Sequence, residues 1–432
     1  MQSFDLTILN YVVAAVVIYY MALFAHLTVR RALRAKMKDE GYRPMFFIVV
    51  PAHNEEVVIG HTIEALLRQD YEHTAIMIMN DGSRDDTSLI AHEYAERYPE
   101  VMVVDRGFEI AGRGKGAVLN HAFEILREMV ADDDPRLKGR AEEDIVICIT
   151  DADGQLERHT LTHVSRYFAE ERVGGVQIGV RIANASTNLL TRMQDVEFVG
   201  FSGFVQEARD AFGSVGLGGN GQFTRLSALI SLGYAPWTDC LTEDLDLGLS
   251  LVRRGWRMRF CPTTYVAQQA VTNLRLLFRQ RTRWVQGHYQ CWSHLPMLMR
   301  DKSVNWLTRM DLSLYLVLVV FVILVSTGMI MSVLATFGVI VVHSTAFNFI
   351  PAGPVHNGFM LFLSFGPLCV FLLTYQARTS SPMPVRWLPA YAIIFAVYTY
   401  TWLVATVWAW SRLVTGRGSW AKTARVNSES AV

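Results

Sequence analysis

Charged residues are nearly absent from two long parts of the chain, residues 11–27 and most of 312–410. Between them lies a globular sequence with an ordinary content of charged residues. Uncharged apolar runs of about 20 residues are typical of membrane-spanning helices, because a helix of that length crosses the hydrocarbon core. We therefore predict an α-helical transmembrane region on each side of a globular domain.

The basic residues beside the first apolar run indicate which way the chain faces. They follow it directly, as Arg30, Arg31, Arg34, Lys36 and Lys38. By the positive-inside rule, the globular domain is then cytoplasmic and the N-terminus lies outside. No basic segment precedes the run and no small-residue cleavage site follows it, so we expect a retained anchor rather than a signal peptide.

The composition excludes two other classes of chain. The 432 residues are 51% hydrophobic and carry no formal net charge, which excludes a disordered or collagen-like chain. The five cysteines are scattered without metal-ligand spacing, which fits reduced thiols in the cytoplasm.

In the globular part, short apolar runs alternate with segments of helical periodicity. Strands are predicted at 45–50, 75–79 and 101–104 and in the run 145–153, with helices between them. This alternation is typical of a Rossmann-like parallel sheet with helical crossovers. Neither a Gly-x-Gly-x-x-Gly nor a Walker-type phosphate loop follows the first strand.

Acidic residues instead follow three of the predicted strands. Glu55, Asp81 and Asp151 come after the first, second and fourth strands, and ligands of such sheets bind at the carboxyl ends of the strands. Carboxylates there suit a metal or the hydrogen-bond donors of a uracil or ribose. Lys115, within the glycine-rich segment 112–116, could approach a diphosphate as a point charge.

The run 145–153 ends in two carboxylates, Asp151 and Asp153, one residue apart. Such a pair can hold Mg²⁺ or Mn²⁺, because these cations prefer oxygen ligands and share them with substrate phosphates. The alternative is a solvated acidic turn after a buried strand, and an isolated Asp-x-Asp favours that alternative.

Three further motifs follow. Residues 218–221 form a small-residue loop that a ligand's atoms could approach closely. Thr242, Glu243 and Asp244 precede an apolar helix. The alternative to a functional role is that they serve simply as its N-terminal cap. The motif 280–284 lies in a basic amphipathic stretch, which could be an interfacial helix with Arg275, Arg279 and Arg281 at lipid headgroups.

Four of these motifs occur in one order: 80–83, 151–153, 242–244 and the Gln-x-x-Arg-Trp of 280–284. Together they resemble the membrane-embedded, inverting family-2 glycosyltransferases, which include cellulose, chitin-oligomer, hyaluronan and poly-N-acetylglucosamine synthases. The resemblance covers about residues 46–292. It implies a glycosyltransferase-A (Rossmann-like) α/β domain on the cytoplasmic side, joined to transmembrane helices.

The resemblance also implies roles for individual residues. Asp244 would be the general base, within a catalytic motif shared with Thr242 and Glu243. The sugar nucleotide would bind residues from several motifs: Pro51, Glu55, Asp81, Lys115, Asp151, Asp153, Gln280 and Arg283. Asp151 and Asp153 would act through Mg²⁺ or Mn²⁺, and Gly219, Asn220 and Trp284 would contact the acceptor. The expected donor is a UDP-sugar, UDP-glucose or UDP-N-acetylglucosamine above others.

The predicted product is an extended β-linked polysaccharide threaded through the protein's own spans. Segments 219–223 and 285–290, however, are similar to bacterial glucosyl-diacylglycerol synthases, so a β-glucosyl lipid is the alternative. A membrane protein that binds sugar nucleotides without catalysis is a third hypothesis. Nearly uncharged spans disfavour a channel or transporter. Membrane lipids are expected partners and nucleic acids are not, while the sequence leaves partner subunits open.

The predicted boundaries are 1–29 for the N-terminal membrane helix, 30–44 for a basic linker, 45–272 for the glycosyltransferase domain, 273–310 for amphipathic interfacial helices, 311–412 for C-terminal membrane helices and 413–432 for a basic tail. The expected location is the bacterial cell membrane, with several spans. Four spans would leave the C-terminus outside, whereas the basic residues from Arg412 onward favour the inside; both topologies stay open. The tail is a candidate lid over the donor site.

Overall fold

In the computed structural model, the described residues are 41–337 and 354–415, with 3–5, 341–343 and scattered single positions between 11 and 23. The predicted N-terminal anchor, the linker before residue 41 and the tail after residue 415 lie outside these described stretches. A parallel pair joins β1 (Ser3–Asp5) to β10 (Val341–His343).

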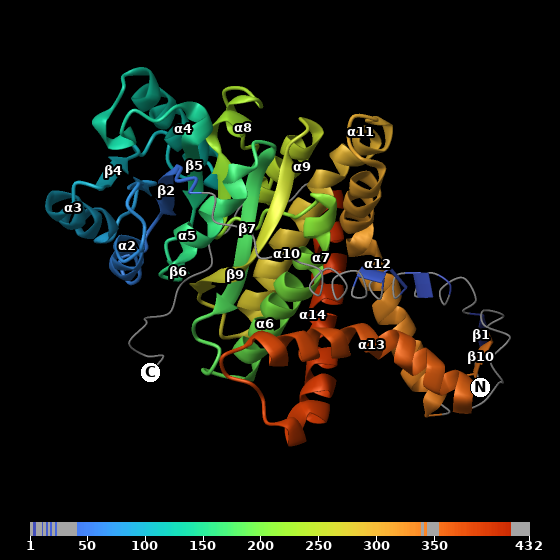
Figure 1. Cartoon of the computed structure of the whole chain (residues 1–432). Helices are drawn as coiled ribbons and strands as arrows, with labels where there is room; N and C mark the ends of the chain where they lie inside the picture. Colours follow the sequence, from blue (N-terminus) through green and yellow to red (C-terminus); the bar gives the residue numbers. More distant parts are fainter. Residues whose placement is uncertain are drawn as a thin grey trace.

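One eight-stranded sheet organises the globular part, in the order β4-β3-β2-β5-β8-β7-β9-β6 (Figure 1). The four predicted strands are confirmed and parallel: β2 (Met45–Ala52), β3 (Thr74–Asn80), β4 (Val101–Asp105) and β5 (Ile145–Ile149). The other four are β6 (Gln155–Leu156), β7 (Val173–Ile182), β8 (Gln222–Arg225) and β9 (Arg257–Gln268). Because β8 runs antiparallel to both β5 and β7, the sheet is mixed.

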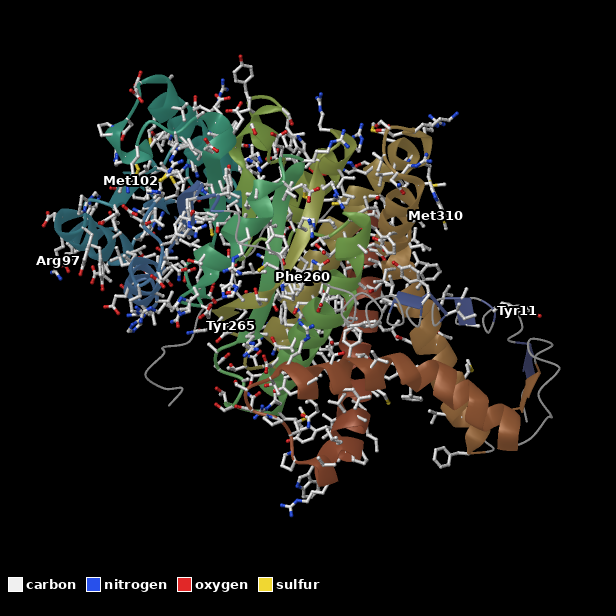
Figure 2. All side chains as sticks on the ribbon, viewed as in Figure 1. Tyr11, Arg97, Met102, Phe260, Tyr265 and Met310 are labelled. Carbon is white, nitrogen blue, oxygen red and sulfur yellow. The ribbon has the colours of Figure 1, made fainter. Side chains whose placement is uncertain are left out.

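Helices cover both faces of this sheet. On one face, α4 (Lys115–Ala131), α8 (Leu226–Ile230) and α9 (Glu243–Arg253) share a core with Phe47 and Val49 of β2. On the other, α2 (Ile59–Leu67), α3 (Thr87–Arg97) and α5 (Thr160–Ser165) pack on a core that includes Phe46 and Ile48. Successive β2 side chains thus alternate between two buried cores. Phe260 of β9, labelled in Figure 2, belongs to the first core.

A long helical layer lies beside the sheet. It contains α6 (Leu189–Gly200), a π-helical turn (Phe201–Gln206), α7 (Glu207–Arg209), α10 (Leu274–Gln290) and α11 (Leu295–Arg300). The chain then forms α12 (Trp306–Thr336), α13 (Pro354–Arg378) and α14 (Leu388–Val414). In Figure 1, α13 runs across the direction of α14.

Two of the described helices are long and apolar enough to cross a membrane, at Trp306–Gly328 and Val385–Val414. Both overlap spans predicted from the sequence. The start of α12 also packs into the globular domain, because Leu312 and Leu316 belong to the same core as α4 and α9. Met310, labelled in Figure 2, lies beside α11 at this junction.

A buried ion pair joins the globular domain to α12. Arg209 Nε donates to Asp311 Oδ2 at 2.8 Å, and the two side chains are 1% and 3% exposed. Ser214 Oγ donates to the same oxygen at 2.6 Å, and the guanidinium carbon of Arg209 lies 4.1 Å from the ring centroid of Tyr315. The apolar helix α12 therefore begins inside the globular domain.

Candidate active site

The Lys115 ammonium group joins motifs from four parts of the chain. Its Nζ donates to Asp151 Oδ1 at 2.6 Å and to the Gly219 carbonyl at 2.8 Å, and lies 4.0 Å from Glu243 Oε1. The segment after β5, the loop before β8 and the starts of α4 and α9 thus converge on one point. Of the three acidic residues that follow the parallel strands, Asp151 contacts Lys115 here.

Lys115 remains a cation in this setting. Burial opposes its charge, but Asp151 and Glu243 outweigh burial and raise the pKa of Lys115. Gly114 precedes it with φ +100°, in the region that favours glycine. The N-terminus of α4, a 17-residue helix, adds partial positive charge at the same place. The corner is therefore suited to an anionic ligand group.

Gln177 of β7 fixes the small-residue loop 218–221. Its Nε2 donates to the carbonyls of Asn220 and Gly221 at 2.9 and 3.2 Å, and its Oε1 accepts from Gly218 N at 2.9 Å. Sequence reasoning missed Gln177, because it lies in mid-strand and no motif marks it. The loop is held by buried hydrogen bonds.

Asn220, predicted to bind the acceptor, is buried and bonded within the protein. Its Oδ1 accepts from Asp151 N and from Thr150 Oγ1, both at 3.1 Å, and its Nδ2 donates to Gln268 at 2.8 Å. The amide of Asn220 therefore fixes the turn that carries Asp151.

Gly219 lies against the predicted base. A Cβ atom at this position would be 2.8 Å from Asp244 Oδ2 and 3.5 Å from Lys115 Nζ, and its φ is +70°. Both the backbone conformation and the space exclude a side chain here. The loop therefore approaches Asp244 as closely as backbone atoms allow.

Glu243 and Asp244 form a buried acidic pair at the start of α9. Burial, with a further contribution from Asp244, raises the pKa of Glu243 to about 7. Burial also raises the pKa of Asp244. A carboxyl group that titrates nearer neutral pH is a better proton acceptor than an ordinary carboxylate. Thr242 occupies the N-cap position and its side chain makes no capping hydrogen bond, while Glu243 and Asp244 lie in the first turn, where acidic residues stabilise a helix.

Asp81 lies in a second polar group. Its carboxylate accepts from the Arg106 guanidinium and, at 3.1 Å, from Gly112 N. Asp81 thus bonds to Arg106 and Gly112, whereas Lys115 bonds to Asp151. Glu55 is buried, and its N–H donates to Thr87 Oγ1 at 2.7 Å; Pro51 lies in β2.

Arg106 was absent from the sequence predictions, although it follows the third strand at the same edge of the sheet as the acidic residues. The rule that selected Glu55, Asp81 and Asp151 would have found it, had it been applied to basic residues as well.

The carboxylate oxygens of Asp151 and Asp153 are metal ligands of the type that fits a divalent cation shared with a diphosphate. Asp151 is partly exposed and faces an ammonium group, and Asp153 Oδ2 accepts from Gln269 N at 3.1 Å. Among the described residues, no cluster of three or more His, Cys, Asp or Glu side chains could hold a metal. Two carboxylates suffice for Mg²⁺ when phosphate and water supply its other ligands.

Gln280, Arg283 and Trp284 lie on α10, which contacts the segment 242–244 through Gly287. A Cβ atom at Gly287 would be 2.6 Å from Thr242 N. The alternative that Arg281 reaches lipid headgroups is wrong: its side chain is 0% exposed and pairs with Glu197 of α6 at 2.7 Å. Arg275 and Arg279 are exposed, as a surface role requires.

A protein-family model, glycosyltransferase-like family 2, matches residues 44–287. The chain belongs to this family. Its fold agrees with that of a mannosyltransferase from Pyrobaculum calidifontis, solved with GDP-Man and Mn²⁺, at a TM-score of 0.53 and 18% identity over 94% of this chain and 98% of that one. The fold is therefore a glycosyltransferase-A-like α/β fold.

Curated relatives are similar over the same region. A β-monoglucosyldiacylglycerol synthase from Synechocystis is 31% identical over 64% of this chain and 54% of its own length. A poly-β-1,6-N-acetyl-D-glucosamine synthase from Staphylococcus aureus is 28% identical over 59% of this chain and 55% of its own length. The chain thus matches about half the length of these family-2 enzymes.

Proposed function

We propose that this family-2 glycosyltransferase transfers a sugar from a UDP-sugar, with inversion, to an acceptor hydroxyl held at the membrane. The observation that carries the proposal is the junction at Lys115. One cation there contacts Asp151 and Gly219 and lies 4.0 Å from Glu243, next to Asp244. Groups for a leaving diphosphate and for a proton transfer therefore lie side by side.

The donor half of the site would hold the nucleotide and its phosphates. Asp81 and Glu55 would contact the nucleoside, and Lys115 would supply a positive charge for the diphosphate. A bound Mg²⁺ or Mn²⁺, held by Asp151 and Asp153, would neutralise charge on the departing UDP. Gln280 and Arg283 would hold the same diphosphate, since a guanidinium binds phosphate oxygens through two parallel hydrogen bonds.

Asp244 would accept the proton of the acceptor hydroxyl. As that oxygen bonds to the anomeric carbon, the bond from this carbon to the UDP oxygen breaks, and UDP leaves with the electron pair. Attack from the face opposite the leaving group converts an α-linked donor into a β-linked product. The raised pKa of Asp244 supports its role as the proton acceptor.

We propose a β-glucosyl lipid as the product, with an extended β-linked polysaccharide as the second candidate. The sequence motifs alone put the polysaccharide first. The named glucosyl-lipid synthases are 31% and 34% identical, against 28% for the poly-N-acetylglucosamine synthase. In addition, the apolar helix α14 contacts the predicted acceptor residue Trp284 through Trp402. Both observations favour an acceptor that enters from the lipid phase.

The proposed location is the cell membrane, with the catalytic domain in the cytoplasm and several spans. Two apolar helices in the described residues support membrane association. The rival of a non-catalytic sugar-nucleotide binder does not account for the buried acidic pair at 243–244, because a binder needs no base.

The test is UDP release from the purified protein in detergent. UDP-glucose, UDP-N-acetylglucosamine, UDP-galactose and UDP-glucuronate are offered singly, with Mg²⁺, Mn²⁺ or chelator, and with or without diacylglycerol. We expect release from UDP-glucose that needs both metal and diacylglycerol, with a lipid-extractable monoglycoside as product. Release without lipid, and a product degraded only by a β-glycanase, would establish the polysaccharide. No release from any donor would contradict the proposed enzyme.

A further inference from the structure

Glu197 of α6 accepts hydrogen bonds from three side chains of two other helices. Arg281 Nη2 of α10 donates at 2.7 Å, Trp402 Nε1 of α14 donates at 2.9 Å, and the Tyr398 hydroxyl of α14 donates as well. The Glu197 side chain is 15% exposed and that of Arg281 is 0% exposed. The Glu197 carboxylate thus links α10, which carries the motif 280–284, to the apolar helix α14.

This network contacts Trp284, the residue predicted to bind the acceptor substrate. The guanidinium carbon of Arg281 lies 4.2 Å from the ring centroid of Trp284 and 5.0 Å from that of Trp402. Residues three apart on a helix share a face, which explains why Arg281 covers Trp284. Phe198, the neighbour of Glu197, meets the Trp284 ring edge-on, with centroids 6.0 Å apart and planes at 82°.

The orientation of Trp284 is therefore set by Arg281 of its own motif together with two residues of other helices, Phe198 and Trp402. Arg281 covers one face of the ring, while Phe198 and Trp402 pack beside it. An indole that stacks on a ligand loses binding when its plane rotates, because the stacking contact depends on geometry. Of these groups, Tyr398 and Trp402 belong to a helix long and apolar enough to span a membrane.

We propose that Glu197, Tyr398 and Trp402 are positioning residues for the acceptor: they hold Arg281, and through it Trp284, at a lipid-acceptor subsite formed where α6, α10 and α14 meet. This inference rests on the proposed function, because it assumes a diacylglycerol-type acceptor at Trp284. It adds a place of entry. The acceptor would enter beside α14, the helix of Tyr398 and Trp402 that is long and apolar enough to span a membrane.

The variants that test this are Tyr398→Phe and Trp402→Phe. Each removes one donor to Glu197; Tyr398→Phe keeps the same ring, and Trp402→Phe keeps an aromatic ring of smaller size. Glu197→Gln is less informative, because it leaves the buried Arg281 without its counter-charge and threatens folding. Matched controls on the same helix are Tyr400→Phe and Trp408→Phe, the latter at a residue that is 58% exposed.

The measurement is the full chain's steady-state kinetics in mixed micelles, with dioleoylglycerol as acceptor and UDP-glucose as donor. Loss of one hydrogen bond in each variant should raise the KM for dioleoylglycerol about 3- to 10-fold. The KM for UDP-glucose should stay within about twofold of wild type. Equal increases in both KM values, or a lower unfolding temperature with unchanged kinetics, would overturn the positioning role.

A second readout needs no turnover. A diacylglycerol carrying a diazirine should label α10 of the wild type on illumination, and should label it less in Trp402→Phe than in Trp408→Phe. Absence of label from α10 in the wild type would overturn the subsite even if the enzyme is active. Failure of the wild type to release UDP from any donor would instead contradict the proposed function, while the labelling result would still decide the subsite.

Discussion

The Nζ atom of Lys115 lies 2.6 Å from Oδ1 of Asp151. Lys115 begins α4 and Asp151 follows β5, so the contact crosses the carboxyl edge of the sheet. The same ammonium group bonds to Gly219 at 2.8 Å. A single side chain thus sets the distance between the predicted diphosphate site and the loop beside the predicted base.

Lys115→Gln should weaken donor binding. The substitution removes the cation and its charge-assisted hydrogen bonds, each worth about 1.5–3 kcal/mol, so the Kd for UDP should rise about 10- to 100-fold. Titration calorimetry with UDP and Mn²⁺ measures this change. Lys138→Gln, at an exposed lysine, should bind UDP as the wild type does. Unchanged affinity in Lys115→Gln would mean that the diphosphate lies elsewhere.

Asp244→Asn should abolish turnover and leave UDP affinity nearly intact. The amide keeps the shape of the side chain but cannot accept the acceptor's proton, which should lower kcat about 100- to 10,000-fold. UDP release under saturating substrate gives the rate, and Asp239→Asn, at an exposed acid nearby, is the control. A wild-type rate in Asp244→Asn would show that another group is the base.

The acidic pair should make stability depend on pH. The pKa of Glu243 is about 7 in the folded protein, against an ordinary 4.5, with burial as the main cause. The folded chain then keeps a proton that the unfolded chain has already released. The contribution of Glu243 to stability therefore falls as pH rises from about 4.5 to about 7.

Thermal unfolding at about pH 5 and about pH 8 tests this, with Glu243→Gln as the comparison. The unfolding temperature should fall more from the lower to the higher pH in the wild type than in the variant, because the glutamine side chain does not titrate. Equal losses in the two proteins would show that Glu243 is ionised throughout this range.

Gly287→Ala, on α10, should displace the neighbouring segment 242–244. The new Cβ would lie 2.6 Å from Thr242 N, a backbone atom, so the segment 242–244 must move. We expect a cost of about 1–3 kcal/mol in stability and a fall in kcat larger than the rise in donor KM. Gly358→Ala, whose Cβ would meet nothing within 4 Å, is the control. Equal kinetics in both variants would contradict a close fit at Gly287.

Local patterns were sufficient to predict the first half of the sheet. The strands β2, β3, β4 and β5 are short apolar runs separated by helical periodicity, so each is specified by its own residues. The carboxylates that follow three of them share an edge because parallel strands end together. The antiparallel β8 was not predicted, since its four residues carry no periodic signal and their direction depends on partners β5 and β7.

The partners of buried charges could not be predicted either. Arg281 was read as a possible headgroup ligand because it lies in a basic amphipathic stretch. Its actual partner, Glu197, comes from a distant helix and has no motif around it. Similarly, Asp81 was assigned to a nucleotide without its partner Arg106. An ion pair between distant segments is decided by tertiary packing, which single-sequence periodicity does not encode.

The pair Arg209–Asp311 also limits how the protein can be divided. A chain cut between α11 and α12 would keep a buried guanidinium and lose its carboxylate, a loss that typically costs about 3–5 kcal/mol. It would also remove Leu312 and Leu316 from the core that α4 and α9 share. The globular domain and the start of α12 are therefore one folding unit, and a fragment that keeps this core must end beyond Leu316, within a helix long and apolar enough to cross a membrane.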